Sequence, residues 1–153
     1  MLTYFLTTKR VFIMANYNFD TSNERSSHMK KIKSQNTIAE ILLRKKLWSC
    51  GIRFRINNKL LIGRPDIAIK KYKLVVFVDG EFWHGYNWDQ KKLRIKANKD
   101  YWIPKIERNM RRDENVNLHY LNNGWIILRF WEKEIKTDLN GCVTMILECL
   151  GRN

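Results

Sequence analysis

Hydrophobic positions recur along the chain with two different periods, and these periods predict where helices and strands lie. Residues 37–49 are predicted to form a helix, because Thr37 and Glu40 have the spacing of a capping box and Gly51 follows the segment. The apolar-periodic run of this segment consists of Ile38, Ile41, Leu42 and Leu47.

Shorter apolar runs predict strands. Residues 52–56 are a first short candidate. Residues 66–69 and 74–79 flank a turn at 70–73, so they are expected to pair as a hairpin. Residues 125–131 form another short apolar strand.

Two more helices complete the pattern. One is predicted from about Tyr101 to Leu121, with Pro104 in its first turn, where proline is tolerated, and with Asn122-Asn123-Gly124 ending it. The other is capped by Asp138. The order α-β-β-β-α-β-α predicts an α/β fold with a mixed sheet flanked by helices.

The length of 153 residues and the hydrophobic content of 44% fit one domain, expected over residues 34–153. Residues 1–33 are expected to form a poorly ordered basic arm. Met14, followed by Ala-Asn, has the form of an alternative translation start. Residues 1–13 are therefore left out of the fold prediction.

The charge balance favours a polyanionic partner. The 29 Lys+Arg against 15 Asp+Glu give a formal net charge of +14, and every phosphate that such a surface neutralises releases condensed counterions. The sequence has no lipidation motif and no apolar run of about 18 residues, so a membrane partner is not expected. Nucleic acid is the expected partner; a basic surface that only keeps the protein soluble is the alternative.

The cysteines Cys50, Cys142 and Cys149 are odd in number and lack C-x-x-C spacing. Cys142 and Cys149 fall at helical spacing and are expected on a buried helix face. Reduced thiols fit a cytoplasmic protein, and a DNA partner would place it at the nucleoid.

Asp66 and Asp79 are the first candidates for chemistry. Asp66 begins one hairpin strand and Asp79 ends the other, so both carboxylates are expected at one end of the sheet. Paired carboxylates suit Mg²⁺, which promotes phosphodiester hydrolysis, and His84 lies close enough in sequence to act as the base for an attacking water. The alternative is that both acids flank turns and that His84 is a satisfied, partly buried histidine.

Other polar positions have two interpretations each. Glu40 completes the capping box but is also a candidate for the site. Asn109 and Asp113 share one helix face, where a solvated charged surface is the default. Phe82 and Trp83 fit either the core or a wedge between base pairs.

Residues 91–99 contain no acid and are bordered by Trp88, Tyr101 and Trp102. They predict a loop that follows DNA phosphates, with aromatic side chains for stacking. Its candidate contacts are Lys91, Lys92, Arg94 and Lys96. An exposed lysine-rich loop without a ligand is the alternative.

In combination, over about residues 25–135, the chain resembles the Vsr-type very-short-patch-repair endonucleases, which share a core with PD-(D/E)xK restriction enzymes. The matching motifs are Arg25-Ser26-x-x-Met29-x-x-Ile32, Thr37-x-x-Glu40, Gly63-Arg64-Pro65-Asp66, Phe77-x-x-Gly80-x-Phe82-Trp83-His84, Lys105-Ile106-x-x-Asn109-x-x-x-Asp113, Gly124-Trp125 and Trp131-Glu132. The resemblance implies a restriction-endonuclease-like fold and a Mg²⁺-dependent enzyme that nicks double-stranded DNA beside a T:G mismatch. We expect a monomer, with DNA repair proteins as candidate partners.

The resemblance also implies roles for single residues. Asp66 and the main-chain carbonyl of Val78 would hold the metal, and His84 would be the general base. Glu40 would support metal-bound waters, and Asn109 and Asp113 would orient water or the histidine. The wedge that opens the duplex would consist of Phe82, Trp83 and Met29.

Two departures from the family pattern change these expectations. Where the family holds a structural zinc, this chain has Glu81, Tyr86, Trp88 and Lys133, none of which is a cysteine or histidine. We therefore expect no structural zinc, and expect packing by Tyr86 and Trp88 to hold the segment. Asp79 replaces the usual histidine, which predicts a metal centre with two acids, Asp66 and Asp79.

Three functional hypotheses follow. The first is a Vsr-like endonuclease that nicks at or near a mismatch. The second is a homing, restriction-type or mobile-element nuclease of the same fold that cuts matched DNA. The third is a DNA-binding protein without catalysis, in which the acids are structural only.

Overall fold

The protein is represented by a computed structural model, which describes residues 35–152. The predicted N-terminal arm and Met29 lie outside the described residues. Within 35–152, no helix combines the length and the apolar character needed to cross a membrane.

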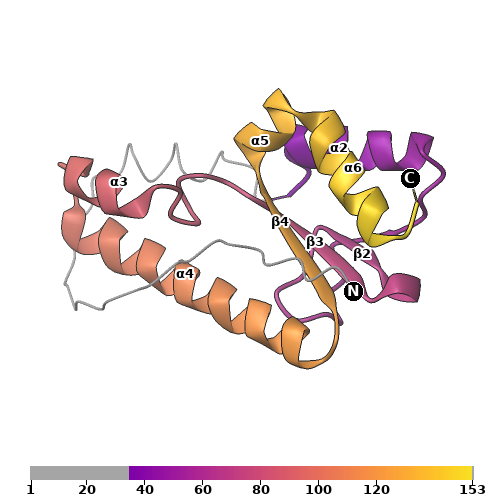
Figure 1. The fold of residues 1–153 in the computed structure, drawn as a ribbon. Helices are drawn as coiled ribbons and strands as arrows, with labels where there is room; N and C mark the ends of the chain where they lie inside the picture. Colours follow the sequence, from indigo (N-terminus) through magenta and orange to yellow (C-terminus); the bar gives the residue numbers. More distant parts are fainter. Residues whose placement is uncertain (1–34, 153) are drawn as a thin grey trace.

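A four-stranded mixed sheet forms the centre of the fold (Figure 1). Its strands are β1 (Arg55–Ile56), β2 (Ile67–Ile69), β3 (Leu74–Asp79) and β4 (Ile126–Trp131), in the spatial order β1-β2-β3-β4. The first three strands pair antiparallel, and β4 lies parallel to β3. The predicted hairpin and mixed sheet are confirmed, although the first strand is shorter than the predicted 52–56.

Helices cover both faces of this sheet. In Figure 1, α2 (Ile38–Ser49), α5 (Glu132–Thr137) and α6 (Leu139–Cys149) lie together on one face, and the long α4 (Lys99–Asn122) lies on the other. A short α3 (Trp88–Arg94) packs beside the start of α4, and a 3-10 turn, η1 (Lys70–Tyr72), joins β2 to β3. This arrangement confirms the expected α/β architecture.

Alternation along the strands divides the core into two parts. Leu74 and Val76 of β3 pack with the helices α2, α5 and α6. Val75 and Phe77 face the other way and pack with Val116 and Tyr120 of α4. The same alternation directs Asp79 toward α4, and this decides its partners.

Four details differ from the sequence prediction. The helices α3 and α5 were not predicted; α3 replaces much of the expected loop at 91–99. Pro104 is the sixth residue of α4 instead of lying in the first turn. In α2, the buried residues are Ala39, Glu40, Leu43 and Leu47, whereas Ile38, Ile41 and Leu42 of the predicted apolar run are exposed.

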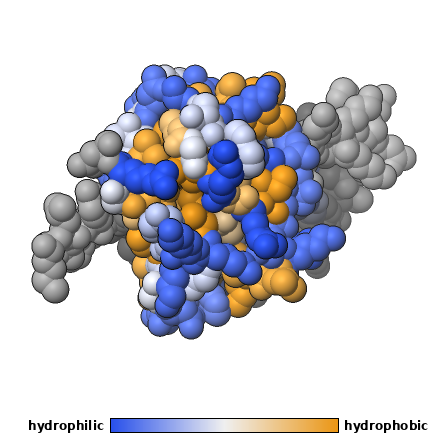
Figure 2. Space-filling view, turned by 90° about the vertical axis from the view of Figure 1, so that its right-hand side faces the viewer, coloured by the Kyte–Doolittle hydropathy of each residue, from blue (hydrophilic) through white to orange (hydrophobic). Residues whose placement is uncertain are grey.

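The reason for the α2 difference is the position of the sheet and α6. They cover the Ala39–Leu43–Leu47 stripe, which has ideal i, i+4 spacing, and the neighbouring stripe remains outside. Hydrophobic side chains also reach the surface between polar ones on the side of the molecule seen in Figure 2. Single exposed apolar residues are common on proteins.

The connection between β1 and β2 is pressed against α4 and leads directly to Asp66. The Tyr120 hydroxyl donates a hydrogen bond of 2.7 Å to the Ile62 carbonyl. Gly63 has φ +74°, and a Cβ there would lie 2.8 Å from Val116 Cγ1. Only glycine combines this backbone conformation with such a close approach.

Gly63→Ala is therefore expected to destabilise the protein by about 2–3 kcal/mol, through backbone strain and the clash together. Gly51→Ala is the matched control, because Gly51 has φ +76° and a Cβ added there would meet no atom within 4 Å. It should cost only about 1 kcal/mol. Urea unfolding measures both losses of stability. Val116→Ala in the Gly63→Ala background removes the clashing methyl groups and should recover the part of the Gly63→Ala loss that exceeds the Gly51→Ala loss. Equal losses for the two glycines would contradict the close-packing argument.

Candidate active site

Arg129 of β4 connects three elements at the end of the sheet. Its Nε donates to Asp79 Oδ2 at 2.7 Å, and its Nη2 donates to Asp79 Oδ1 at 3.1 Å. Its Nη1 donates to Asn117 Oδ1 at 2.9 Å, and Nη2 lies 3.1 Å from Asp113 Oδ1. Burial alone would lower the pKa of Arg129, but the charges of Asp79 and Asp113 outweigh it and raise the pKa. The guanidinium therefore remains charged.

His84 is held by the same group of residues. Its Nδ1 lies 2.5 Å from Asp113 Oδ2 and 3.5 Å from Asp79 Oδ1. Burial alone would raise the pKa of Asp113, but the hydrogen bond with His84 and the positive charge of Arg129 outweigh it and lower the pKa. An ionised carboxylate can only accept, so Nδ1 carries the proton in this hydrogen bond. In the neutral imidazole, Nε2 is then the basic nitrogen.

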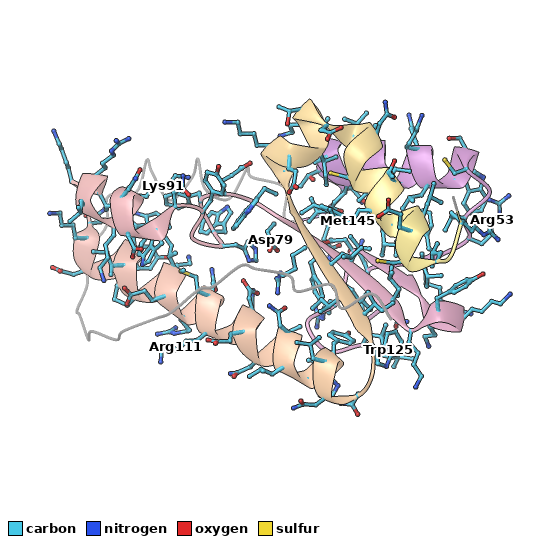
Figure 3. The ribbon with its side chains drawn as sticks, in the orientation of Figure 1. Arg53, Asp79, Lys91, Arg111, Trp125 and Met145 are labelled. Carbon is cyan, nitrogen blue, oxygen red and sulfur yellow. The ribbon has the colours of Figure 1, made fainter. Side chains whose placement is uncertain are left out.

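The loop that carries His84 is fixed by α4 as well. Asn109 Nδ2 donates to the Trp83 carbonyl at 3.2 Å, one residue before the histidine. Asn109 and Asp113 therefore share one helix face, as predicted, and the structure directs that face toward residues 83 and 84. Figure 3 shows Asp79 between α4 and the end of β3, which is the location of this cluster.

Asp66 lies across the β2–β3 pair from Asp79. Its Oδ2 accepts a hydrogen bond of 2.7 Å from the Val78 main-chain nitrogen. Burial raises the pKa of Asp66 to about 6, and the negative charges of Glu40 and Asp79 add to the rise against the effects of Val78 and Arg44. The predicted convergence of Asp66, Asp79 and His84 at one end of the sheet is thus present. Asp66 has this raised pKa although Arg44 lies nearby.

Glu40 has the capping role that the sequence predicts, and it is also buried close to this end of the sheet. It receives hydrogen bonds from the main-chain nitrogens of Asn36 and Thr37, and Arg44 Nη2 lies 2.5 Å from its Oε2. Its charge contributes to the raised pKa of Asp66. Glu40 is therefore both a helix cap and part of the electrostatic environment of Asp66.

The donor set around Asp66 fits Mg²⁺. Residues 35–152 contain no group of three or more His, Cys, Asp or Glu side chains arranged to hold a metal ion. Magnesium does not need one, because it is commonly bound through one or two carboxylates together with waters and substrate phosphate. Asp66 supplies a carboxylate in a region of excess negative charge, and Val78 supplies a neighbouring main-chain carbonyl.

Asp79 was expected to be the second metal ligand. In the described structure, both of its carboxylate oxygens instead accept hydrogen bonds from Arg129. Arg129 itself was not identified from the sequence. The one signal that could have identified it is a cationic residue in an otherwise apolar strand, Ile127-Leu128-Arg129-Phe130.

Phe82 and Trp83, which directly precede His84 in the chain, form an aromatic cluster with Trp102 of α4. The Phe82 ring centroid lies 5.1 Å from that of Trp83 and 5.2 Å from that of Trp102. Lys105 Nζ lies 5.4 Å from the Trp83 ring centroid. Phe82 is 40% exposed, whereas Trp83 is half-buried. The ring available at the surface is therefore that of Phe82, with Trp83 and Trp102 behind it.

The predicted phosphate-following loop is instead mostly helical, and part of its charge is already paired. Lys92 Nζ lies 2.5 Å from Glu107 Oε1, and Lys91 Nζ lies 5.0 Å from the Tyr86 ring centroid. Arg94 and Lys96 are exposed. Figure 3 shows Lys91 far along the molecule from Asp79. This segment was expected to act as a loop, and folding into α3 places Lys92 against Glu107 of α4.

At the four positions where the resemblance implies zinc ligands, the residues make other contacts. Glu81 Oε1 accepts a hydrogen bond of 2.6 Å from the Lys133 main-chain nitrogen in the first turn of α5. The Tyr86 ring packs on Trp131 with centroids 5.1 Å apart, and Trp88 is buried against Ile106 and Met110. Tyr86 and Trp88 pack as the sequence predicts, and the Glu81 contact is an addition. The absence of zinc stays a prediction.

Replacing Asp66 by asparagine is expected to stabilise the metal-free protein at pH 8 by about 2 kcal/mol. The raised pKa of about 6 means that the folded state binds more protons than the unfolded state between about pH 4 and 6, so Asp66 ionisation opposes folding above that window. The gain should shrink as the pH falls through 6. Urea unfolding in EDTA at pH 5 and 8 measures it, with Glu114→Gln as the exposed control. A pH-independent effect would contradict the assignment.

The sequence was compared with known proteins. The family model described as DNA mismatch endonuclease Vsr matches residues 17–90. The type II nicking enzyme V.HpaIIP of Haemophilus parainfluenzae is 49% identical over 116 residues, which cover 75% of this chain and 82% of that protein. The type II nicking enzyme V.NmeDIP of Neisseria meningitidis serogroup C is 42% identical over 130 residues, covering 85% and 88%.

The DNA mismatch endonuclease Vsr of Escherichia coli (strain K12) is 32% identical over 108 residues, covering 71% of this chain and 69% of that protein. All three relatives are nicking enzymes or mismatch endonucleases by name. The third hypothesis, a DNA-binding protein without catalysis, is therefore rejected. With the fold, the Asp113–His84 pair and these similarities together, the chain belongs to the Vsr family of DNA endonucleases.

Proposed function

We propose that this endonuclease uses Mg²⁺ to nick one strand of double-stranded DNA at or near a T:G mismatch. The observation that carries the proposal is the pairing of His84 with Asp113 at the end of the sheet where Asp66 lies. A base oriented by an ionised acid, close to a carboxylate that suits a hard cation, is the arrangement that phosphodiester hydrolysis requires.

His84 acts as the general base. Asp113 accepts from Nδ1 at 2.5 Å and so fixes both the ring orientation and the tautomer. Nε2 then takes the proton of the attacking water, and Asp113 and Asp79 stabilise the resulting imidazolium. Asn109 positions the loop through the Trp83 carbonyl.

Asp66 is the metal-binding carboxylate, with the Val78 carbonyl as a further ligand and Glu40 close enough to receive hydrogen bonds from metal-bound waters. When bound, the ion polarises the phosphate and lowers the pKa of the attacking water. We assign Asp79 to a different task from the one its sequence position suggests. Its ion pair with Arg129 holds the end of β3 against α4, and it faces His84 as a second acid.

Phe82 is the leading residue of the wedge that opens the duplex. Its exposed ring rests on Trp83 and Trp102, so that it is rigid enough to enter between base pairs. Unstacking a base step costs a few kcal/mol, and a mismatched step costs less than a paired one. A wedge of this kind therefore favours mismatched DNA.

Nicking of matched DNA is the second candidate function. The relatives with 49% and 42% identity are named type II nicking enzymes, and these names specify no mismatch. The same catalytic residues would serve both substrates, so the two functions differ only in what the DNA-facing surface requires of the duplex.

Nicking of labelled duplexes tests the proposal. With Mg²⁺, the parent protein should nick a T:G-mismatched duplex far faster than the fully paired one, and EDTA should abolish nicking. His84→Ala should lower the rate by a factor of about 10² to 10⁴, the usual contribution of a general base. Rates are read from strand cleavage on denaturing gels, after a melting curve has shown that the variant is folded.

Equal cutting of both duplexes would select the second candidate and leave the catalytic assignment intact. A parental rate in the His84→Ala protein would overturn the mechanism. Nicking that continues in EDTA at the parental rate would overturn the metal requirement.

Phe82→Ala tests the wedge. Because the ring is 40% exposed, its removal should lower the unfolding free energy by about 1 kcal/mol or less, but it should slow nicking of the mismatched duplex about tenfold or more. Binding of a random duplex should change little. Leu93→Ala, at an 82% exposed position on α3, is the control and should affect neither. Parallel losses of folding and binding would indicate that Phe82 is only a packing residue.

A further inference from the structure

One face of α4 carries hydrogen-bond donors and positive charges but no acid. Its members are separated by four, three, four, three and four residues, which is the spacing that keeps side chains on one face of a helix. We call them the α4 row. They are Tyr101, Lys105, Arg108, Arg112, Asn115 and His119.

Among the acids of α4, only Asp113 approaches a member of this row, with Oδ1 3.7 Å from Arg112 Nη2. Glu107 and Asp113 are buried and paired, the first with Lys92 and the second with Arg129 and His84. Asp100 and Glu114 are exposed, but at about 100° per residue they lie roughly 100–140° around the helix from the centre of the row. The row therefore presents hydrogen-bond donors and positive charges with no exposed acid among them.

The far end of the row lines an open groove. Arg108, Arg112 and His119 form the α4 wall of this groove together with Arg111, and Ile62 contributes from the β1–β2 connection. The opposite wall is held in place by the Tyr120–Ile62 hydrogen bond described above. A cationic wall on α4 that faces the apolar side chain of Ile62 suits a sugar–phosphate backbone, which combines charge with apolar sugar. Figure 3 shows that Arg111 points away from Asp79, on the outer side of α4.

The near end of the row joins the aromatic cluster. Lys105 Nζ donates to the Tyr101 hydroxyl and lies above the rings of Trp83 and Trp102. Between the two ends, Arg112 Nη2 lies 3.7 Å from Asp113 Oδ1, so the row passes directly beside the His84 pair. The 18 steps along the helix from Tyr101 to His119 rise about 27 Å, the length of about eight base pairs.

We propose that duplex DNA lies along the α4 row, with the phosphates of one flank of the nicked site on Arg108 and Arg112. The inference rests on the proposed function and extends it by giving the DNA a path. The duplex is wedged by Phe82, cut beside His84, and held on one side by α4. In this arrangement α4, more than the segment at 91–96, provides the main electrostatic contact.

The salt dependence of binding tests the contact. Arg108→Gln/Arg112→Gln removes two charges, and each lost phosphate contact lowers the magnitude of the slope of log K against log[salt] by about 0.9. We expect a decrease of about 1.8 for this double variant and about 0.9 for Arg108→Gln alone. The matched control is Lys70→Gln/Lys71→Gln, which removes two exposed charges at the opposite end of the β2–β3 hairpin and should leave the slope unchanged. Binding is measured in EDTA, so that no cleavage occurs.

The flank preference is tested with shortened duplexes. The parent protein should lose affinity when the duplex is cut back on one side of the nick and much less when it is cut back on the other. The Arg108→Gln/Arg112→Gln protein should lose no further affinity on the sensitive side, because the contact is already absent. Melting curves of both double variants establish that they are folded.

The outcomes separate this inference from the proposed function. A parent protein that binds and nicks DNA, together with unchanged slopes for the α4 variants, would overturn the α4 path alone. Equal slope changes in the α4 and Lys70/Lys71 variants would mean that total charge, and not the row, governs binding, and would also overturn it. A parent protein that binds no duplex would overturn both proposals.

Discussion

The site depends on the charge of Arg129, which is placed where a parallel strand meets the end of β3. Its guanidinium forms ion pairs with both Asp79 and Asp113, so two buried carboxylates share one counterion in a region where an unpaired charge would be costly. Because Asp113 is ionised, it can accept the His84 Nδ1 proton and leave the other ring nitrogen basic. Because Asp79 is bound through both oxygens, the end of β3 is fixed to β4 and α4. The tautomer of His84, the proposed general base, therefore depends on an arginine that acts through Asp113.

The pKa of Asp66, just before β2, is shifted in the opposite direction from that of Asp113. Asp66 lies near Glu40 and Asp79, and burial together with these charges raises its pKa to about 6. A carboxylate held in this way opposes folding at neutral pH and gains the most from a cation, so the same feature lowers stability and favours metal binding. In the proposed mechanism, the two parts of the site therefore differ in role. The Asp79–Arg129–Asp113–His84 part, whose charges are paired, transfers the proton, and the Asp66 part binds Mg²⁺.

Acidic and basic side chains are also separated on the surface of α4. The buried acids of α4 point toward the sheet or toward α3, and the exposed acids lie away from the row that borders the active site. The aromatic cluster begins at one end of this row and the arginine groove lies at its other end. In the proposed mechanism, one long helix therefore serves both tasks: Asn109 and Asp113 on its inner face support catalysis, and the α4 row contacts DNA. The segment that carries His84 is attached to α5 by the Glu81–Lys133 hydrogen bond, at the positions where the family pattern places zinc ligands.

The sequence by itself determined the secondary structure around the site, the convergence of Asp66, Asp79 and His84, and the shared face of Asn109 and Asp113, because these follow from local periodicity and from a hairpin whose ends must meet. It did not determine the partner of Asp79, since Arg129 lies 50 positions away and reaches it only through the parallel β3–β4 register. Nor did it determine which stripe of α2 is buried, because Ile38–Ile41–Leu42 and Ala39–Leu43–Leu47 are both apolar and only the sheet and α6 distinguish them. The helix α3 was hidden for a similar reason: its charged sequence gains stability from Trp88 and Lys92 packing on α4, contacts that exist only in the tertiary structure.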